Sequence, residues 1–202
     1  MVITLIGYRG SGKSSVGPVL AKALGFTVVD SDAVIEERAG CSIRQIFAAE
    51  GEAGFRDREA AVIRDLTRQS GLVLAAGGGA ILRESNRAAI RAAGPVVWLD
   101  VSAAELARRI GGDATTTERR PSLTGRSVVD EVADVLNARE PLYREAATLI
   151  ISGEQGTPEQ IAATILQSLH DVRHGADSAD GADSADRQDV RGSSQQQTGA
   201  SE

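Results

Sequence analysis

The sequence predicts an α/β protein with a parallel sheet, on three observations. Short apolar runs alternate with helical periodicity along the first 170 residues, a pattern typical of strands joined by crossover helices. A glycine-rich motif stands between the first apolar run and the first helix. Aromatic residues make up only 3% of the chain, so the core must consist mainly of Ala, Val, Leu and Ile, which suits helices packed on a sheet.

The first half of the chain is predicted to form three strands and four helical segments. Gly25 is expected to end the first helix, because glycine readily adopts the left-handed conformation of a helix C-terminus. The third strand runs into three consecutive glycines, Gly77 to Gly79. The predicted strands are Val2–Ile6, Thr27–Val29 and Leu72–Ala75, and the predicted helices are Lys13–Leu24, Ala33–Ala39, Ile43–Ala49 and Glu52–Arg68.

The second half continues the alternation. Ser102 and Glu105 form a predicted capping box, which should start the helix that follows the fourth strand. Residues 111–126 break all periodicity and are rich in Gly, Thr and Arg, as expected of a flexible lid. The predicted helices are Glu84–Ala93, Val128–Leu142 and Pro158–Leu169, and the predicted strands are Val96–Leu99 and Thr148–Ile151.

The character of the chain changes after His170. The hexapeptide Gly-Ala-Asp-Ser-Ala-Asp occurs twice, at 175–180 and 181–186, and a run of Gly, Ser and Gln follows. Nothing in this composition can bury a core. We therefore expect one folded domain at residues 1–170, with the lid at about 111–126, and a disordered acidic tail at 171–202.

Charge and cysteine content exclude several classes of protein. The net charge is −6, and the tail alone carries seven acids against three bases, so the domain is close to neutral. We therefore expect no nucleic-acid partner and no binding to an anionic membrane. The single cysteine, Cys41, excludes an internal disulfide. The opening apolar run is too short for a signal peptide, so a cytoplasmic location is expected.

Gly7 to Ser14 match the phosphate-binding pattern G-x-x-x-x-G-K-[ST] in full. The glycines allow backbone N–H groups to turn inward onto phosphates, and the helix N-terminus adds its dipole. Lys13 is expected to bridge the β- and γ-phosphates of ATP, and Ser14 to ligate Mg²⁺. A plain glycine turn does not explain the Lys-Ser pair. The motif predicts a nucleoside triphosphate without fixing the reaction, although one domain is small for a motor and no Asn-Lys-x-Asp guanine-reading segment is present.

Four further features follow strands or helices on the acceptor side. Asp30-Ser31-Asp32 comes just after the second strand and could serve a metal ion and a hydroxyl, or simply cap a helix. Arg56 and Glu59 share a helix face, as a solvated ion pair would. Gly77 to Gly79 cost entropy, so something must approach their backbone closely. Arg119-Arg120-Pro121 lie in the predicted lid, which would close over phosphates.

Together these residues resemble the shikimate kinases, from about Ile3 to Leu169. The resemblance includes the phosphate-binding motif, Asp-x-Asp, Phe-Arg-x-x-Glu, Gly-Gly-Gly, the Arg-Pro of the lid and Arg-x-Pro-Leu-Tyr at 139–143. It implies a three-layer fold like that of the nucleoside monophosphate kinases, with a five-stranded parallel sheet ordered 2-3-1-4-5 and helices on both faces. It also implies transfer of the ATP γ-phosphate to the 3-hydroxyl of shikimate, on the route to chorismate and the aromatic amino acids.

The resemblance implies a role for each matched residue. Arg56 and Arg139 would clamp the shikimate carboxylate, with Glu59 holding Arg56, and Asp32 would orient or deprotonate the attacking hydroxyl. Lys13, Asp32 and Arg120 are the implied catalytic residues. The implied substrate-binding residues are Asp32, Arg56, Gly77, Gly78, Gly79 and Arg139, and the implied ATP-binding residues are Gly10, Ser11, Gly12, Lys13, Ser14, Ser15, Arg109, Arg120 and Pro158.

The implied cofactor is one Mg²⁺ per subunit, bound directly by Ser14 and through water by Asp30, with ATP as phosphoryl donor and a monomeric enzyme. Asp100, at the end of the fourth strand, looks like a metal-binding carboxylate, but it precedes the capping box at Ser102 and is expected to serve that helix start, so Asp30 is preferred near the metal. The lid is longer than the family pattern, which leaves Arg119 as an alternative to Arg120; Arg120 is preferred because it directly precedes Pro121. The protein could also be a related small-molecule kinase, such as a gluconate kinase, a nucleotide-binding regulator, or a scaffold that acts through its tail.

Overall fold

The computed structural model describes residues 1–111 and 128–183, the last part, 172–183, by its backbone alone. The chain divides into two compact units, Met1–Leu166 and the residues from Gln167 onward. The fold and the site below belong to the first unit. The lid predicted at 111–126 lies, apart from Gly111, outside the described residues.

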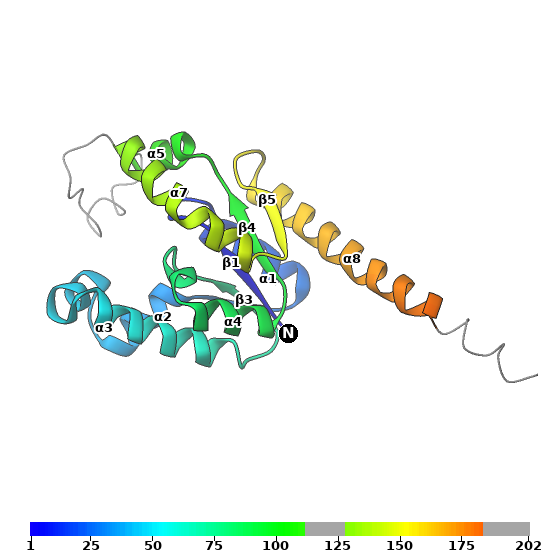
Figure 1. Ribbon diagram of the computed structural model, residues 1–202, viewed down its shortest axis with the longest axis horizontal. Helices are drawn as coiled ribbons and strands as arrows, with labels where there is room; N and C mark the ends of the chain where they lie inside the picture. The colour runs from blue at the N-terminus through cyan, green and yellow to red at the C-terminus, as the bar shows by residue number, and fades with distance from the viewer. Residues whose placement is uncertain (112–127, 184–202) are drawn as a thin grey trace, which may run out of the picture. The chain divides into compact units, whose positions relative to one another are not determined.

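A five-stranded parallel sheet forms the centre of the first unit, in the order β2-β3-β1-β4-β5 (Figure 1). This is the predicted order, and it is confirmed. In the register, Val2 lies beside Leu72 and Thr4 beside Val96. The strands are β1 (Val2–Ile6), β2 (Thr27–Asp30), β3 (Leu72–Ala75), β4 (Val96–Asp100) and β5 (Leu149–Ser152).

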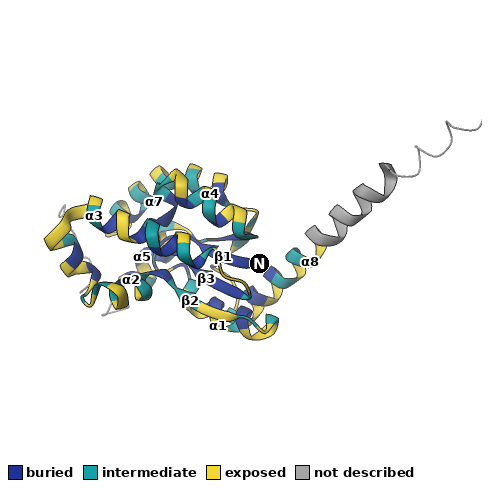
Figure 2. Ribbon diagram, turned by 90° about the horizontal axis from the view of Figure 1, so that it is seen from below, coloured by how far each residue is buried: buried dark blue, intermediate teal, exposed yellow. Residues whose placement is uncertain are grey.

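Helices lie on both faces of the sheet, so the predicted three-layer arrangement is also confirmed (Figure 2). On one face α3, α4 and α7 cover the sheet, and on the other lie α1 and the first turns of α8. The helices are α1 (Lys13–Leu24), α2 (Ser31–Ala39), α3 (Ile43–Leu66), the short 3-10 helix η1 (Ala80–Leu82), α4 (Glu84–Ala93), α5 (Ala103–Gly111), α7 (Val128–Ala146) and α8 (Pro158–Asp183).

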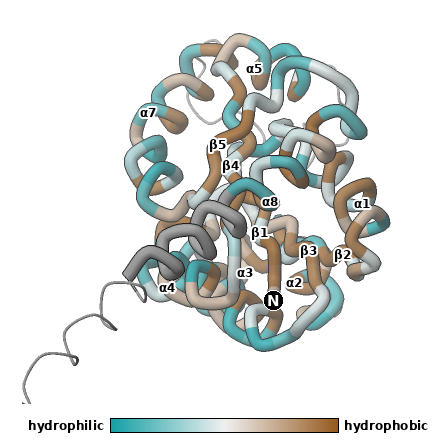
Figure 3. The backbone as a smooth tube through the Cα atoms, turned by 90° about the vertical axis from the view of Figure 1, so that its right-hand side faces the viewer, coloured by the Kyte–Doolittle hydropathy of each residue, from teal (hydrophilic) through white to brown (hydrophobic). Residues whose placement is uncertain are grey.

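The core follows from the alternation of side chains along the strands. Val2 and Ile6 of β1 point to the face of α3, α4 and α7, where Trp98 of β4 stacks on Tyr143 of α7 with ring centroids 5.5 Å apart. All five residues of β1 are buried, because helices cover both faces of this central strand. In Figure 3 the strands β1 and β3 are largely brown, the colour of hydrophobic residues. The edge strands β2 and β5 are only half-buried.

The predicted break between the third and fourth helical segments, Ile43–Ala49 and Glu52–Arg68, is confirmed at Gly51. Its φ of 69° and ψ of −172° interrupt α3, and a left-handed φ of this kind favours glycine. The helix ends at Ser31 and Leu66 differ from the prediction by two residues each, and the C-terminal ends of α7 and α8 differ by more. α7 continues past Leu142 to Ala146, although Pro141 lies inside it, because Tyr143 and Ala146 are buried in the core and hold its last turn.

α8 also runs past the predicted end at Leu169 and reaches Asp183, so residues 171–183 are helical where we predicted disorder. No proline interrupts this stretch, and its repeat supplies Ala176, Ala179 and Ala182, which have the highest helix propensity of any residue type. The rest of the predicted tail, 184–202, lies outside the described residues.

The predicted capping box at Ser102 and Glu105 is half right. The Ser102 hydroxyl accepts from the Glu105 N–H at 3.4 Å, as a cap should. The reciprocal bond from the Ser102 N–H to the Glu105 carboxylate is replaced. The Ser102 N–H donates to Glu154 at 2.6 Å instead, and the Glu105 carboxylate binds Arg108 and Arg109. Tertiary partners displace the local reciprocal bond here. A complete capping box that we did not predict lies at Ser42 and Gln45 and starts α3.

Candidate active site

The loop from β1 to α1 is shaped by glycines in conformations that other residues rarely adopt. Gly10 and Gly12 have φ values of 80° and 98°. Gly12 is also the N-cap of α1, so no side chain covers the first N–H groups of that helix. An uncapped helix N-terminus carries unpaired N–H groups and a positive dipole end. The loop therefore offers backbone donors to an anion, as the motif predicts.

The Lys13 ammonium lies inside this loop. Its Nζ donates to the carbonyl oxygens of Gly7 and Tyr8 at 2.8 and 2.9 Å and contacts the Ser11 hydroxyl at 3.3 Å. Burial lowers the pKa of Lys13 to about 8, although the carboxylates of Asp32 and Asp30 oppose the shift. The structure thus brings Lys13, Asp32 and Asp30 within electrostatic reach of one another.

The lowered pKa of Lys13 gives a testable pH dependence. The protonated amine should attract phosphates, so we expect full ATP affinity below about pH 8 and a loss approaching tenfold per pH unit above it, until the amine of the bound state also deprotonates. Isothermal titration of ATP between about pH 7.5 and 9.5 measures this. The matched control is Lys13→Arg, whose guanidinium stays charged and should give a flat profile. A wild-type profile as flat as that of the variant would contradict the assignment.

Asp30 sits beside Ser14 at the carboxyl end of β2. One carboxylate oxygen caps α2 by accepting from the N–H groups of Asp32 and Ala33 at 2.9 and 3.4 Å. The other lies 3.5 Å from the Ser14 hydroxyl. The reading of Asp30 as a helix cap is therefore confirmed, and its second carboxylate oxygen faces the first turn of α1. The two oxygens are hard ligands of the kind that suits Mg²⁺.

The three consecutive glycines each meet one predicted acceptor residue. The Asp32 carboxylate lies against the α-carbon of Gly77, and the Arg56 guanidinium lies so close to Gly79 that a methyl group there would be 2.5 Å from Nη1. The Gly78 carbonyl accepts from Arg139 at 3.2 Å. The turn from β3 into η1 thus gathers Asp32, Arg56 and Arg139 from three different helices.

Arg56 is buried and held by two carboxylates. Its Nη1 donates to Glu59 at 2.8 Å, and the Glu59 side chain is only 1% exposed. This corrects the reading of the pair as a solvated one. Glu52 accepts from Nε and Nη2 at 3.3 and 3.2 Å, from a side chain that is 65% exposed. Glu52, the more exposed of the two partners, therefore binds the Nε and Nη2 edge of the Arg56 guanidinium. A ligand carboxylate could replace Glu52 at this edge.

Arg139 shares its contact with a residue to which we had given no role. Tyr143 lies one turn further along α7 and donates its hydroxyl to the same Gly78 carbonyl at 2.7 Å. Burial raises the pKa of Tyr143 to about 12, so its hydroxyl keeps its proton and remains a donor. The stack of Tyr143 on Trp98 fixes α7 against β4 and thereby places Arg139 at the glycine turn.

Arg109 joins the phosphate loop to the β5–α8 connection. Its guanidinium donates to the carbonyl oxygens of Gly10 and Gly153 at 3.3 and 2.9 Å, and to Glu105 at 2.7 Å. The two arginines on Glu105 lower the pKa of that carboxyl to about 2. Pro158 begins α8 a few residues after Gly153. The structure therefore brings Arg109 to the phosphate loop and to the segment that precedes Pro158.

The remaining predicted residues are placed as follows. Ser11 is buried in the phosphate loop, and Ser15 is exposed in the first turn of α1. Arg120 and its alternative Arg119 lie outside the described residues. Asp100 ends β4, and burial together with nearby Glu140 raises the pKa of its carboxyl. Asp30, with its oxygen facing Ser14, fits the metal better.

Besides Tyr143, two further residues of the site were not predicted. Ser31, in the middle of the Asp-Ser-Asp segment, binds the glycine turn, because its hydroxyl accepts from the Gly77 N–H at 2.9 Å. Glu52 lies one turn before Arg56 on the same helix, and this spacing was visible in the sequence as an i,i+4 pair. The Ser31 contact joins segments 46 residues apart, and no local pattern reveals such a contact.

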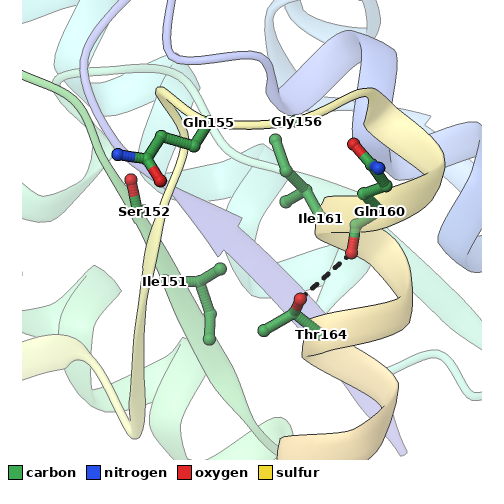
Figure 4. A pocket seen from close by; sticks show the side chains of 7 residues that line it. All are labelled: Ile151, Ser152, Gln155, Gly156, Gln160, Ile161 and Thr164. Atoms are coloured by element: carbon green, nitrogen blue, oxygen red, sulfur yellow. Dashed lines mark hydrogen bonds between the residues drawn. The ribbon is translucent and has the colours of Figure 1, made fainter.

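A separate hollow of about 470 Å³ lies between β5 and the start of α8 (Figure 4). Its walls include Ile151, Ile161 and Thr164. Two of its polar side chains are engaged, since Thr164 donates to the Gln160 carbonyl and the Gln160 side chain accepts from the Thr157 N–H. None of the predicted site residues lines it.

Over the described residues, no helix is long and apolar enough to cross a membrane, and no cluster of three His, Cys, Asp or Glu side chains could hold a metal.

Known proteins resemble this chain within the predicted domain, residues 1–170. The family model of the shikimate kinases matches residues 9–170. The shikimate kinase of Rhodopirellula baltica is 49% identical over 164 residues, which cover 81% of this chain and 88% of that protein. The shikimate kinase of Nitratidesulfovibrio vulgaris is 45% identical over 152 residues, which cover 75% of this chain and 86% of that protein.

Solved structures agree. The shikimate kinase of Acinetobacter baumannii, solved in complex with shikimate, superposes with a TM-score of 0.78 at 39% identity, over 84% of this chain and 93% of that one. The shikimate kinase of Bacteroides thetaiotaomicron gives a TM-score of 0.76 at 29% identity, over 84% and 98% of the two chains.

Proposed function

The chain belongs to the shikimate kinase family, and we propose that it transfers the γ-phosphoryl group of ATP to the 3-hydroxyl of shikimate, a step toward chorismate and the aromatic amino acids. One observation carries the proposal. Asp32, Arg139 and Arg56 meet Gly77, Gly78 and Gly79 in turn, beside the phosphate loop. One carboxylate and two guanidinium groups suit an acceptor that carries hydroxyls and a carboxylate.

The mechanism assigns each group a task. The loop of Gly10 to Ser15 and Lys13 hold the phosphates of ATP, while Arg109 and Pro158 border the adenine. Arg56 and Arg139 bind the acceptor carboxylate, and Asp32 orients the attacking hydroxyl and accepts its proton. Arg120 stabilises charge on the transferring group. Positioning and electrostatics then supply most of the acceleration.

The metal assignment rests on Ser14 and Asp30. Their oxygens face each other across 3.5 Å, so a Mg²⁺ ion that brings its own water shell fits a hydroxyl ligand and a water-bridged carboxylate. Mg²⁺, one per subunit, would neutralise charge on the β- and γ-phosphates. Removing the metal with a chelator should abolish turnover.

The glycine turn gives a sharp prediction. Gly79→Ala places a methyl group 2.5–2.6 Å from the Arg56 nitrogens, so the guanidinium must move and KM for shikimate should rise by at least about tenfold. The control is Gln69→Ala, at an exposed residue outside the site. Steady-state kinetics of both variants measures the difference. Equal KM values in the two would contradict the placement of Arg56 at the acceptor.

The division of the chain gives a further prediction. We propose that residues 1–170 are the kinase domain and that the acidic tail serves no catalytic purpose, in keeping with a family match that ends at residue 170. Truncation after Asp183 and after His170 should leave kcat within about twofold, because neither removes a contact of the site described above. A large loss of kcat in the shorter form alone would assign the end of α8 a role in catalysis.

Location and partners are proposed on narrower grounds. The single cysteine suits a reducing cytoplasm, and the near-neutral domain offers no field that would attract nucleic acid or an anionic membrane. We also propose a monomer, which sedimentation velocity tests directly.

The proposed reaction is tested by coupled detection of ADP release. Turnover should require shikimate and should be slow without an acceptor, because a closed site excludes the water that would hydrolyse ATP. Release with gluconate and none with shikimate would refute the proposal. Normal ATP binding without turnover of any acceptor would instead favour a regulator.

A further inference from the structure

Arg9 is an arginine of the phosphate loop whose buried Nε has no hydrogen-bonding partner among the residues that the structure describes. The only contact of its guanidinium recorded there is with the neighbouring Tyr8 ring, 5.9 Å from the ring centroid. Every other arginine placed at the site, namely Arg56, Arg109 and Arg139, donates hydrogen bonds to protein oxygens.

A buried donor on a charged side chain is costly when it stays unpaired. A protein retains such a group where a ligand supplies the missing acceptor or where strain serves the mechanism. A phosphate loop gives no packing reason for arginine, because a shorter or apolar side chain would fill the same position without the cost. The unpaired Nε therefore indicates that an oxyanion completes the site.

The position of Arg9 indicates which oxyanion. A methyl group added to Gly78 would lie 3.4 Å from the Arg9 backbone nitrogen and 3.6 Å from the Gly7 carbonyl oxygen, which binds Lys13. Arg9 thus stands where the phosphate loop touches the acceptor turn. The Tyr8 ring lies 5.9 Å from the Arg9 guanidinium carbon and 6.0 Å from that of Arg139.

We propose that Arg9 binds the transferring phosphoryl group, first on ATP and then as the phosphate ester of the product. This inference rests on the proposed function. The acceptor carboxylate already has Arg56 and Arg139 at the glycine turn, whereas Arg9 belongs to the loop that holds phosphates. During transfer the bond from the γ-phosphorus to the ADP oxygen breaks, and a bond to the 3-oxygen of shikimate forms. The hydroxyl proton passes to Asp32, and Arg9 only donates hydrogen bonds.

Arg9→Met keeps an unbranched apolar stem and removes the donors. We expect kcat to fall by about 10²-fold, the loss seen when one preorganised oxyanion donor is removed. KM for shikimate should stay within about threefold, because Arg56 and Arg139 bind its carboxylate, whereas the affinity for ATP should fall together with that for the product, because Arg9 holds the γ-phosphate before transfer. The dissociation constant of shikimate 3-phosphate, measured by calorimetry with ADP present, should rise by about tenfold or more. Arg9→Lys, which keeps a charge, should recover part of kcat.

The stability of the ligand-free variant separates a functional role from a structural one. Because Arg9→Met removes an unsatisfied buried donor, its Tm should equal or exceed that of the wild type by about 2–4 °C. Arg68→Met, at an exposed arginine far from the site in sequence, controls for loss of a positive charge.

Three results would overturn the inference. A raised KM for shikimate at unchanged kcat would make Arg9 part of the carboxylate clamp. A fall in Tm together with kcat would make it a structural residue, and unchanged kinetics with unchanged product affinity would leave it without a role in transfer. Failure of the proposed function is distinguishable, because the wild type would then show no shikimate-dependent ADP release, while the effect on Tm could still be measured.

Discussion

Replacing Asp32 by Asn is expected to lower kcat by about 10²–10⁴-fold, the usual range for loss of a positioned acid–base group. Asp32 lies against Gly77, and its charge acts on Lys13, so it stands between the acceptor turn and the phosphate loop. Asn has the same size, so the packing on Gly77 should survive while the negative charge is lost. Steady-state kinetics with shikimate, at saturating ATP, measures the effect.

The Asp32→Asn variant can also be tested by the pH dependence of its ATP affinity. The Asp32 carboxylate raises the pKa of Lys13 against the effect of burial. Without it the pKa of Lys13 should fall further, so the loss of ATP affinity at high pH should begin at a lower pH in Asp32→Asn. Asp57→Asn is the matched control, since Asp57 is exposed and pairs with Arg83. A kcat for Asp32→Asn within about tenfold of the wild type would contradict a role in proton transfer.

Replacing Arg56 by Met should damage both binding and folding. Loss of charged hydrogen bonds to the acceptor carboxylate should raise KM for shikimate by about 10–100-fold. The Glu59 carboxylate, only 1% exposed, would also lose its partner at 2.8 Å. Removing one member of a buried ion pair costs about 3–5 kcal/mol of unfolding free energy, because a buried charge is left uncompensated.

A double variant separates the two effects. Arg56→Met with Glu59→Met replaces the whole pair by apolar side chains, which is often close to neutral for stability. We therefore expect denaturant unfolding to show recovered stability in the double variant, while KM for shikimate stays high. If KM recovered together with stability, the effect of Arg56 would be structural and the acceptor carboxylate would bind elsewhere.

Much of the fold was predictable because its signals are local. The buried run Val2–Ile6, the glycine motif and the turn residues fixed β1 and α1 to the residue, and the resemblance supplied the strand order. Helix ends were less predictable. α7 runs through Pro141 because tertiary burial of Tyr143 outweighs the local cost of a proline, and the bond from Ser102 to Glu154 depends on a loop 52 residues away.

The site shows the same division. Lys13, Ser14 and Asp30 were identified from spacing, and the structure brings them together. The burial of the Arg56–Glu59 pair and the contact of Tyr143 with Gly78 were not visible in the sequence, because both depend on which helix faces cover the glycine turn. The unpaired state of Arg9 is likewise a three-dimensional property, since only the surrounding atoms decide whether a donor has a partner.

The central claim is that the acceptor turn at Gly77–Gly79 presents the 3-hydroxyl of shikimate to the phosphates held by Lys13. The most direct test is ³¹P and ¹H NMR of the product formed from ATP, Mg²⁺ and shikimate. We expect a single phosphate ester whose phosphorus couples to the proton on carbon 3. Phosphorylation at another hydroxyl, or ATP consumption with no ester formed, would contradict it.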